Sequence, residues 1–476
     1  MNRFLLLPFL LSSFILSAQN KGYEIKITFK PFKNQYIYLG HYSGKSMPID
    51  DSIRLNDKSE GVFKGTKPLG GGIYIIGFPN KDRYFEVLVD KQQHFTILAD
   101  TADLDNRKFV NSPDNTLFIE YQQAMRQRGE KINQLRQQLA GTHGADSVKL
   151  SKDIAIADSA ISAYRRNVVA KNPNTLLATL LHLMEEPKIP PAAEHPGGRY
   201  DSAYAYRYFK NHYWDNINFF DERLARTPSV LFEDRIDKYF KTLVYHNADS
   251  VNKEIDWMLG YASVSDEMNR FLLVKFINRY LKQQYMWEDA VFVHLFEKYF
   301  SQKEYSWLTP EGKKIITERA YNLMANIMGN PAENILLPDS TGTTRNLYEV
   351  KSPYTLVAFY DPNCGHCKEV LPKLDSMYRN KWKADSLHIY AVAKEVDASP
   401  ADWKKFISSN HLEGWTHVFY SKAEETSRIN ASIPSYSQLY DVQSFPTLYL
   451  LDRDKRIIAK KLTWEQINEI LDYRKK

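Results

Sequence analysis

Cys364 and Cys367 are the only two cysteines in the 476 residues, and they enclose the short sequence Gly-His. A disulfide between them would close a very small loop, and small loops gain little stability from cross-linking. The thiolate is the nucleophilic form of cysteine, and it reacts with the sulfur atoms of disulfides. We therefore expect this pair to form and open a disulfide as chemistry, rather than to hold the fold together.

The residues around the pair indicate a buried strand, a turn and then a helix. Residues 355–360 are a short apolar run, which Asp361-Pro362-Asn363 brings to an end. After Cys367, apolar side chains recur at helical spacing, at Val370, Leu371, Leu374 and Met377. Cys364 is thus expected at a helix N-terminus, where unpaired amide N–H groups and the helix dipole stabilise a thiolate. The spacing keeps Cys367 one turn further along, within reach of Cys364.

Two basic residues accompany the cysteines. His366 lies between them and Lys368 follows them directly. A protonated imidazole or an ammonium group near a thiol stabilises its thiolate form. We predict that Cys364, Cys367 and His366 form the catalytic group of the site.

This arrangement resembles the thioredoxin fold, and its details resemble the exported TlpA/ResA-like branch. Residues 335–339 and 342–350 are similar to the N-terminal hairpin of that branch. The later elements come in the order of the family: a strand at 387–393, the loop Phe445-Pro446-Thr447, strands at 448–451 and 457–462, and a helix from Trp464. The resemblance implies an α/β thioredoxin-like domain over residues 330–476.

The resemblance also implies roles for single residues. Pro446 would follow a cis peptide bond and lie against the cysteine pair, and the Phe445 backbone would pair with an extended substrate. Cys364 would attack a substrate disulfide, and Cys367 would then release the reduced substrate. The Cys-Gly-His-Cys sequence is that of protein disulfide isomerases, in which the histidine stabilises the reduced form. We expect a reduction potential between roughly −270 mV, as in thioredoxin, and roughly −180 mV, as in the isomerase.

Three positions depart from the family pattern. Asn363 stands where a Trp usually precedes the first cysteine, and Ala358 stands where thioredoxins carry a buried acid. Val370 occupies the position of the acid that some ResA-like proteins place after the second cysteine. The proton acceptor for the second thiol therefore stays open between Glu369, Asp361 and water.

The function that these features predict is thiol–disulfide exchange with protein substrates. Reductase-type action is the commoner role in this branch, while the Cys-Gly-His-Cys motif also fits an oxidase or isomerase. We expect no cofactor beyond the Cys364–Cys367 disulfide, and an unidentified redox partner in the cell envelope. The alternative is a non-catalytic envelope binding module on a thioredoxin scaffold. A zinc site is disfavoured because the chain offers no second ligand pair at the usual spacing.

The rest of the chain predicts two further domains, and a multi-domain fold. Residues 22–105 contain short runs of alternating polarity, beginning with Tyr23, Ile25, Ile27 and Phe29, and indicate an all-β sandwich. Residues 113–328 show apolar residues at helical spacing and indicate an all-α region, interrupted by a loop over the proline-rich residues 187–198. Neither segment carries a pattern from which a function can be inferred.

Composition and the first residues predict export. Residues 1–19 combine a basic Arg3, an apolar stretch and a small-residue exit, which is the pattern of a signal peptide. Their removal leaves a small positive net charge without a cluster of basic residues, so we expect no nucleic-acid partner. No later apolar run is long enough to span a bilayer, so we expect no membrane span after cleavage and a location in the periplasm or cell envelope.

Overall fold

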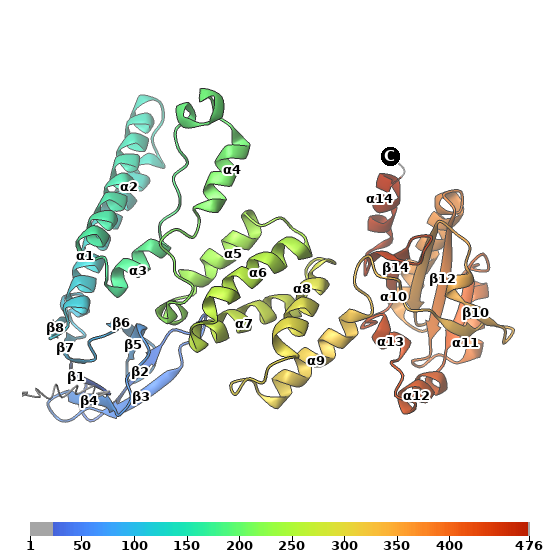
Figure 1. Ribbon diagram of the computed structural model, residues 1–476, viewed down its shortest axis with the longest axis horizontal. Coiled ribbons are helices and arrows are strands. Elements are labelled where there is room, and N and C mark those ends of the chain that lie inside the picture. Colours follow the sequence, from blue (N-terminus) through green and yellow to red (C-terminus); the bar gives the residue numbers. More distant parts are fainter. Residues whose placement is uncertain (1–21, 475–476) are drawn as a thin grey trace, which may run out of the picture. The chain divides into compact units, whose positions relative to one another are not determined.

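The computed structural model describes residues 22–474, and the predicted signal peptide at 1–19 lies outside them. The described residues form two compact units. The first comprises residues 22–244 and 258–272, and the second comprises residues 245–257 and 273–474. The predicted fold class is confirmed, because a β region, a helical region and a thioredoxin-like region follow one another along the chain (Figure 1). The domain boundaries proposed from the sequence stay predictions.

The first unit begins with two four-stranded sheets that form a sandwich. Their orders are β4-β1-β7-β8 and β3-β2-β5-β6, and β1 and β7 run parallel while the other neighbours are antiparallel. Ile25, Ile27 and Phe29 are buried between the sheets, as their alternation predicts. The strands are β1 (Tyr23–Lys30), β2 (Tyr36–His41), β3 (Ile49–Arg54), β4 (Glu60–Gly65), β5 (Gly72–Gly77), β6 (Tyr84–Val89), β7 (His94–Asp100) and β8 (Lys108–Val110).

Helices follow the sandwich in the first unit. α1 and α2 form a long antiparallel hairpin (Figure 1), and residues 187–198 contain only two 3-10 turns, as the prolines predict. The elements are η1 (Leu104–Asn106), α1 (Pro113–Leu139), α2 (Ala145–Lys171), α3 (Leu176–Leu183), η2 (Ala192–Glu194), η3 (Pro196–Gly198), α4 (Ser202–Asn211), η4 (Glu222–Arg226) and α5 (Phe232–Thr242). α6 (Ala248–Ala262) and α7 (Asp266–Leu281) contribute residues to both units.

The second unit contains further helices and the thioredoxin-like region. Its helices before that region are α8 (Glu288–Leu295), the π-helical turn η5 (Phe296–Phe300) and α9 (Pro310–Met324). A short hairpin of β9 (Leu336–Pro338) and β10 (Thr344–Asn346) comes next, where the sequence predicts it, and the turn η6 (Leu347–Glu349) follows.

The thioredoxin-like region is built on a five-stranded sheet of order β13-β12-β11-β14-β15. β11, β12 and β13 run parallel, and β14 and β15 are each antiparallel to their neighbour. The strands are β11 (Tyr354–Tyr360), β12 (Leu387–Lys394), β13 (Thr416–Tyr420), β14 (Thr447–Leu451) and β15 (Ile457–Lys460). The helices are α10 (Gly365–Met377), the π-helical turn η7 (Tyr378–Trp382), α11 (Pro400–Ser409), α12 (Lys422–Asn430), α13 (Tyr436–Leu439) and α14 (Trp464–Arg474).

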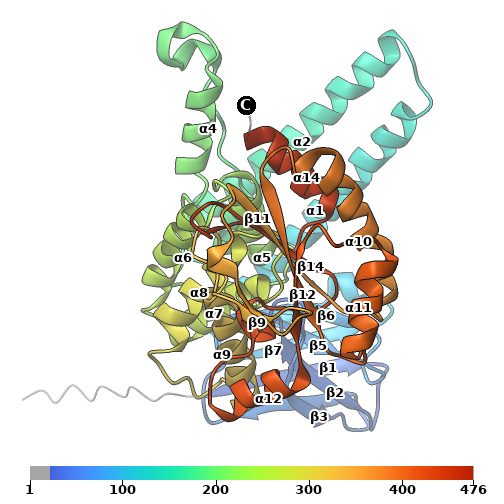
Figure 2. The same ribbon diagram turned by 90° about the vertical axis from the view of Figure 1, so that its right-hand side faces the viewer.

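Both faces of this sheet are covered, which explains the unbroken apolar run of β11. Leu356, Ala358 and Tyr360 face a core that also contains side chains of α10, α11 and α14. Figure 2 shows these three helices beside the sheet. Val357 and Phe359 face a second core with the β9–β10 hairpin and α13. A central strand buried on both sides has no polar alternation. The C-terminal end of β11 is thereby fixed, and the cysteine motif follows it directly.

Candidate active site

The turn between β11 and α10 places the first cysteine at the start of the helix. Cys364 is the N-cap residue of α10, and its carbonyl accepts a hydrogen bond from the Lys368 amide at 3.2 Å. Asp361 organises the turn, because its carbonyl accepts from the Cys364 amide at 3.1 Å and its carboxylate accepts from the Asn363 amide at 2.9 Å. The strand, turn and helix predicted from the sequence are therefore present.

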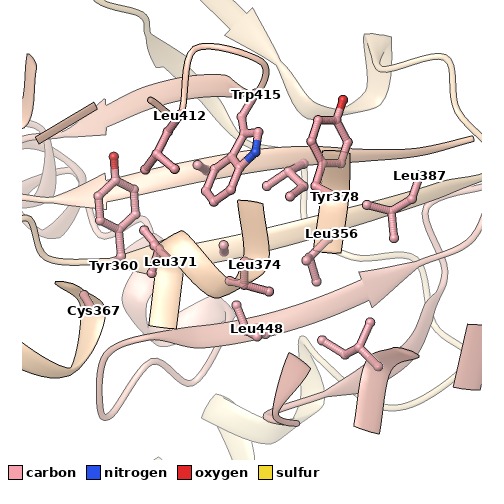
Figure 3. Close-up of a cluster of buried hydrophobic side chains, with 14 of the residues drawn as sticks. Leu356, Tyr360, Cys367, Leu371, Leu374, Tyr378, Leu387, Leu412, Trp415 and Leu448 are labelled. Atoms are coloured by element: carbon pink, nitrogen blue, oxygen red, sulfur yellow. The ribbon is translucent and has the colours of Figure 1, made fainter. Parts of the chain in front are cut away.

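The two thiols have different surroundings. Cys364 is half-buried, and its thiol donates a hydrogen bond to the Phe445 carbonyl at an Sγ–O distance of 3.8 Å. Cys367 is fully buried among the apolar side chains between the sheet and α10, in one cluster with Tyr360 and Leu371 (Figure 3). Both cysteines are free thiols in this structure. One sulfur thus lies at the surface, and the other lies behind it.

The loop opposite the cysteines comes from a distant part of the chain. The Phe445–Pro446 peptide bond is cis, as the family resemblance implies. Cys364 and Phe445 are separated by 81 positions in the sequence, and the pairing of β11 with β14 brings them together. The structure therefore unites four of the predicted site residues: Cys364, Cys367, Phe445 and Pro446.

Burial controls the protonation of the second thiol. It raises the pKa of Cys367 well above the ordinary value, and a hydrogen bond with the Asp361 backbone offsets only part of this effect. A hydrogen bond with the Cys364 side chain and the nearby charge of Asp361 raise the pKa of Cys367 further. Cys367 therefore remains a neutral thiol at physiological pH, and it needs a base before it can act as a nucleophile.

The three remaining predicted residues occupy different positions. Asp361 is buried beside Cys367, and its charge acts on that thiol. Glu369 and His366 are exposed on the first turn of α10. His366 also lines a cavity of about 460 Å³ together with Pro446 and Trp464. Of the two carboxylates, Asp361 therefore fits a buried proton acceptor for Cys367 better than the exposed Glu369 does.

A buried hydrogen-bonded chain next to the cysteines has no signal in the sequence. Tyr360 precedes Asp361, and its hydroxyl accepts from the Trp403 indole at 3.0 Å and lies 3.4 Å from His417 Nδ1. His417 Nε2 lies 2.8 Å from the Leu412 carbonyl, and burial lowers the pKa of this histidine to about 4. A carbonyl can only accept, so Nε2 carries the proton and Nδ1 accepts from Tyr360. No pattern in the sequence connects these residues.

Within residues 22–474, no group of three or more His, Cys, Asp or Glu side chains could hold a metal ion. His182, His195, His212 and His294 of the helical region accordingly belong to no such group.

Comparison with known families identifies two segments of the chain. Residues 353–457 match a family described as thioredoxin-like, and residues 153–325 match a domain of unknown function, DUF5106. The C-terminal region therefore belongs to the thioredoxin-like family. This assignment confirms the predicted resemblance to TlpA-like thioredoxin-fold proteins.

Several solved structures are similar to parts of the chain. A thioredoxin-like protein from Bacteroides caccae is 22% identical, with a TM-score of 0.45, and the match covers 61% of this chain and 98% of that one. A domain of a possible thiol-disulfide isomerase from Cytophaga hutchinsonii is 34% identical, with a TM-score of 0.27, covering 31% and 93%. The thioredoxin domain of a thiol-disulfide oxidoreductase from Bacteroides vulgatus is 26% identical, with a TM-score of 0.27, covering 31% and 96%. No curated protein matches the chain.

Proposed function

We propose that this protein is a thiol–disulfide oxidoreductase that exchanges disulfides with protein substrates through Cys364 and Cys367. The observation that carries the proposal is the pairing of a half-exposed thiol with a buried one at the start of α10, opposite a cis-proline loop. The match of residues 353–457 to the thioredoxin-like family supports the same assignment. A pair that served only as a staple would have no use for this difference in exposure.

In the reducing direction, the Cys364 thiolate attacks one sulfur of a substrate disulfide. A bond forms between Cys364 and that sulfur, and the other substrate sulfur leaves as a thiolate that takes up a proton. Cys367 then loses its proton and attacks the Cys364 sulfur, and the second substrate sulfur leaves. The substrate gains two electrons and two protons, and the protein retains a Cys364–Cys367 disulfide. A dithiol redox partner in the cell envelope returns the pair to the reduced form.

Neighbouring groups assist each step. The N-terminus of α10 and a protonated His366 stabilise the Cys364 thiolate. Asp361, buried beside Cys367, accepts the proton of that thiol, and we prefer it to the exposed Glu369. The Phe445 backbone and Pro446 bind the substrate as a short extended strand. The same groups run the reaction backwards as an oxidase or isomerase, and the redox partner determines the direction.

The same proposal includes export to the periplasm or cell envelope. It depends on the signal-peptide pattern of residues 1–19. Within residues 22–474, no helix has both the length and the apolar character needed to cross a membrane. We propose that the Cys364–Cys367 disulfide is the only redox group of the protein.

Serine substitutions test this function. Cys364→Ser removes the nucleophile, so we expect insulin disulfide reduction to fall at least about 1000-fold. Cys367→Ser keeps the first step and blocks the second, so a mixed disulfide with the substrate should accumulate and be visible by mass spectrometry under non-reducing conditions. In the wild type, iodoacetamide should modify Cys364 long before Cys367.

Ser409→Ala, at the exposed end of α11, is a control that leaves both sulfurs and the substrate-binding loop in place, and it should retain most of the activity. If the Cys364→Ser protein reduces insulin as fast as the wild type, the proposed function is wrong. A wild type without turnover would favour the non-catalytic binding module.

A further inference from the structure

The cavity beside the cysteines continues into a second cavity of the same unit. The first, of about 460 Å³, reaches from His366 and Pro446 to Lys461 and Leu462. The second, of about 740 Å³, is lined by residues of α9 and of the segment between α7 and α8. Gln443, Lys461 and Leu462 line both cavities. We call the two together the extended groove.

The helical wall of the extended groove carries exposed apolar side chains. Tyr285 is 56% exposed and Ile315 is 54% exposed, and both line the second cavity. Polar side chains that can bond a peptide backbone, such as Gln284 and Asn322, line the same cavity. Large apolar side chains interspersed with hydrogen-bonding groups are typical of surfaces that bind polypeptides.

Buried ion pairs join this helical wall to the segment that leads to the cis proline. Asp441 lies five residues before Pro446, and both of its carboxylate oxygens accept from Arg319 Nη1 of α9 at 2.8 Å. The Lys461 ammonium also contacts Asp441, and Gln443 donates to its Oδ1 at 2.9 Å. Arg319 in turn donates to Gln283 at 2.6 Å. The wall and the loop are therefore connected through one carboxylate.

A second ion pair joins the helical wall to the thioredoxin-like region. Lys460 of β15 and Asp289 of α8 form a buried pair, and Lys460 also donates to Asn326 Oδ1 at 2.7 Å. Buried charges are costly unless they are paired, so these groups fix the relative positions of α8, α9 and β15. The helical wall is therefore held in a fixed position within the extended groove.

We propose that residues 281–286 and one face of α9, which carries Ile315, Arg319 and Asn322, form the second wall of a binding groove for polypeptide substrates. A substrate chain with a cysteine at Cys364 would continue from the Phe445 backbone past Leu462 to Tyr285 and Ile315. Each cavity alone has the volume that binds a drug-sized molecule, so the two in series fit an extended peptide rather than a small disulfide. This inference rests on the proposed function and gives the helices before the thioredoxin-like region a part in substrate selection.

Matched substrates and matched variants test the groove. One substrate is a peptide of about 20 residues, long enough to cover both cavities, with a central cysteine held as a mixed disulfide with thionitrobenzoate. The other is the same mixed disulfide on N-acetylcysteine amide. Reduced protein is used in excess over substrate, so that each molecule reacts once and no added reductant is needed. In the Tyr285→Ser, Ile315→Ser double variant, we expect the KM of the peptide, taken as the half-saturating concentration under these conditions, to rise at least about fivefold, with the maximal rate unchanged and the small substrate unaffected.

Tyr321→Ser is the control, because Tyr321 is 58% exposed on the same helix as Ile315 and does not line the groove. It should behave as the wild type with both substrates. If the peptide KM in the double variant stays at the wild-type value, the proposed groove is wrong. It is also wrong if activity falls equally with the peptide and with the small substrate. A wild type that releases thionitrobenzoate from neither substrate overturns the proposed function itself, and this inference with it.

Discussion

The β sandwich and the thioredoxin-like region both bury a sheet core, but they bury different polar groups. The sandwich core is apolar, and a buried neutral amide, that of Asn115, bonds the backbone of β6. In the thioredoxin-like region, ionisable groups such as Cys367, His417 and Asp441 are buried near the reactive turn and the cis-proline loop. Arg107 is an ionisable exception in the first region, and it bonds the carbonyls of Leu104 and Glu86.

Buried neutral groups and buried ionisable groups therefore have different effects on the protein. A neutral amide that satisfies backbone groups fixes a connection, and its effect is independent of pH. A buried ionisable group costs stability unless it is paired, and its state depends on pH and on its neighbours. The three predictions below test this division, from the largest expected effect to the smallest.

The largest effect should come from Arg319→Met. This change leaves the buried Asp441 carboxylate with Lys461 as its remaining cationic partner, and breaking a buried pair costs about 3–5 kcal/mol. The free energy of unfolding, measured by hydrogen exchange of peptides around Asp441, should fall by roughly this amount. Lys26→Gln is the control, because it breaks the exposed pair of Lys26 with Glu24 and should cost less than about 0.5 kcal/mol. Equal effects of the two changes would remove the distinction between the regions.

The next effect concerns pH. An unfolded histidine takes up a proton below its ordinary pKa of about 6.5, whereas buried His417 does so only near the pKa of about 4. The unfolded state therefore binds more protons between these values, and stability falls as the pH is lowered from 6.5 to 4. His417 should account for a loss of about 3 kcal/mol over that window.

Urea unfolding of the wild type and of His417→Gln at several pH values measures how much of the pH-dependent loss of stability is due to His417. The variant should lose about 3 kcal/mol less than the wild type between pH 6.5 and pH 4. His143→Gln removes an exposed histidine and should keep the wild-type dependence. Parallel curves for His417→Gln and the wild type would show that His417 is not a buried neutral group.

The smallest effect belongs to the first unit. Asn115 accepts from the Leu88 amide at 2.7 Å and donates to the Leu88 carbonyl at 2.8 Å. Asn115→Ala leaves both groups without these bonds, so the stability of β6 should fall by about 2 kcal/mol. Hydrogen exchange should report the same loss at pH 6 and pH 8. Asn133→Ala, on the exposed face of α1, should change little, and a loss that depends strongly on pH would contradict the comparison.

Periodic patterns predicted much of the fold, and they failed where burial is slight or where an element is short. The alternation of Tyr23 to Phe29 identified β1 because its inner side chains are buried. β3 carries no such signal, because most of its side chains are exposed and no alternation of apolar and polar residues marks it. The stretch between β12 and β14 contains β13, α12 and α13, which are too short to show a period.

The site was predictable where a local motif carries it. The Cys364–Cys367 spacing and the Phe445–Pro446 loop are local, and the structure brings them together. Asp361 was one of three options for the proton acceptor, and only its burial separates it from Glu369. Arg319 and Asp441 are 122 positions apart, and neither has a neighbouring pattern that points to the other. Contacts of this kind arise from the tertiary fold alone.

The presence of only two cysteines in these 476 residues has a consequence for maturation. Cys364 and Cys367 can bond covalently only to each other or to another molecule, because the chain offers no third sulfhydryl. In an oxidising compartment, a newly made chain can therefore form only one intramolecular disulfide. It cannot become trapped with non-native disulfides. Any adduct of higher mass on a non-reducing gel consequently identifies a molecule captured at this one place.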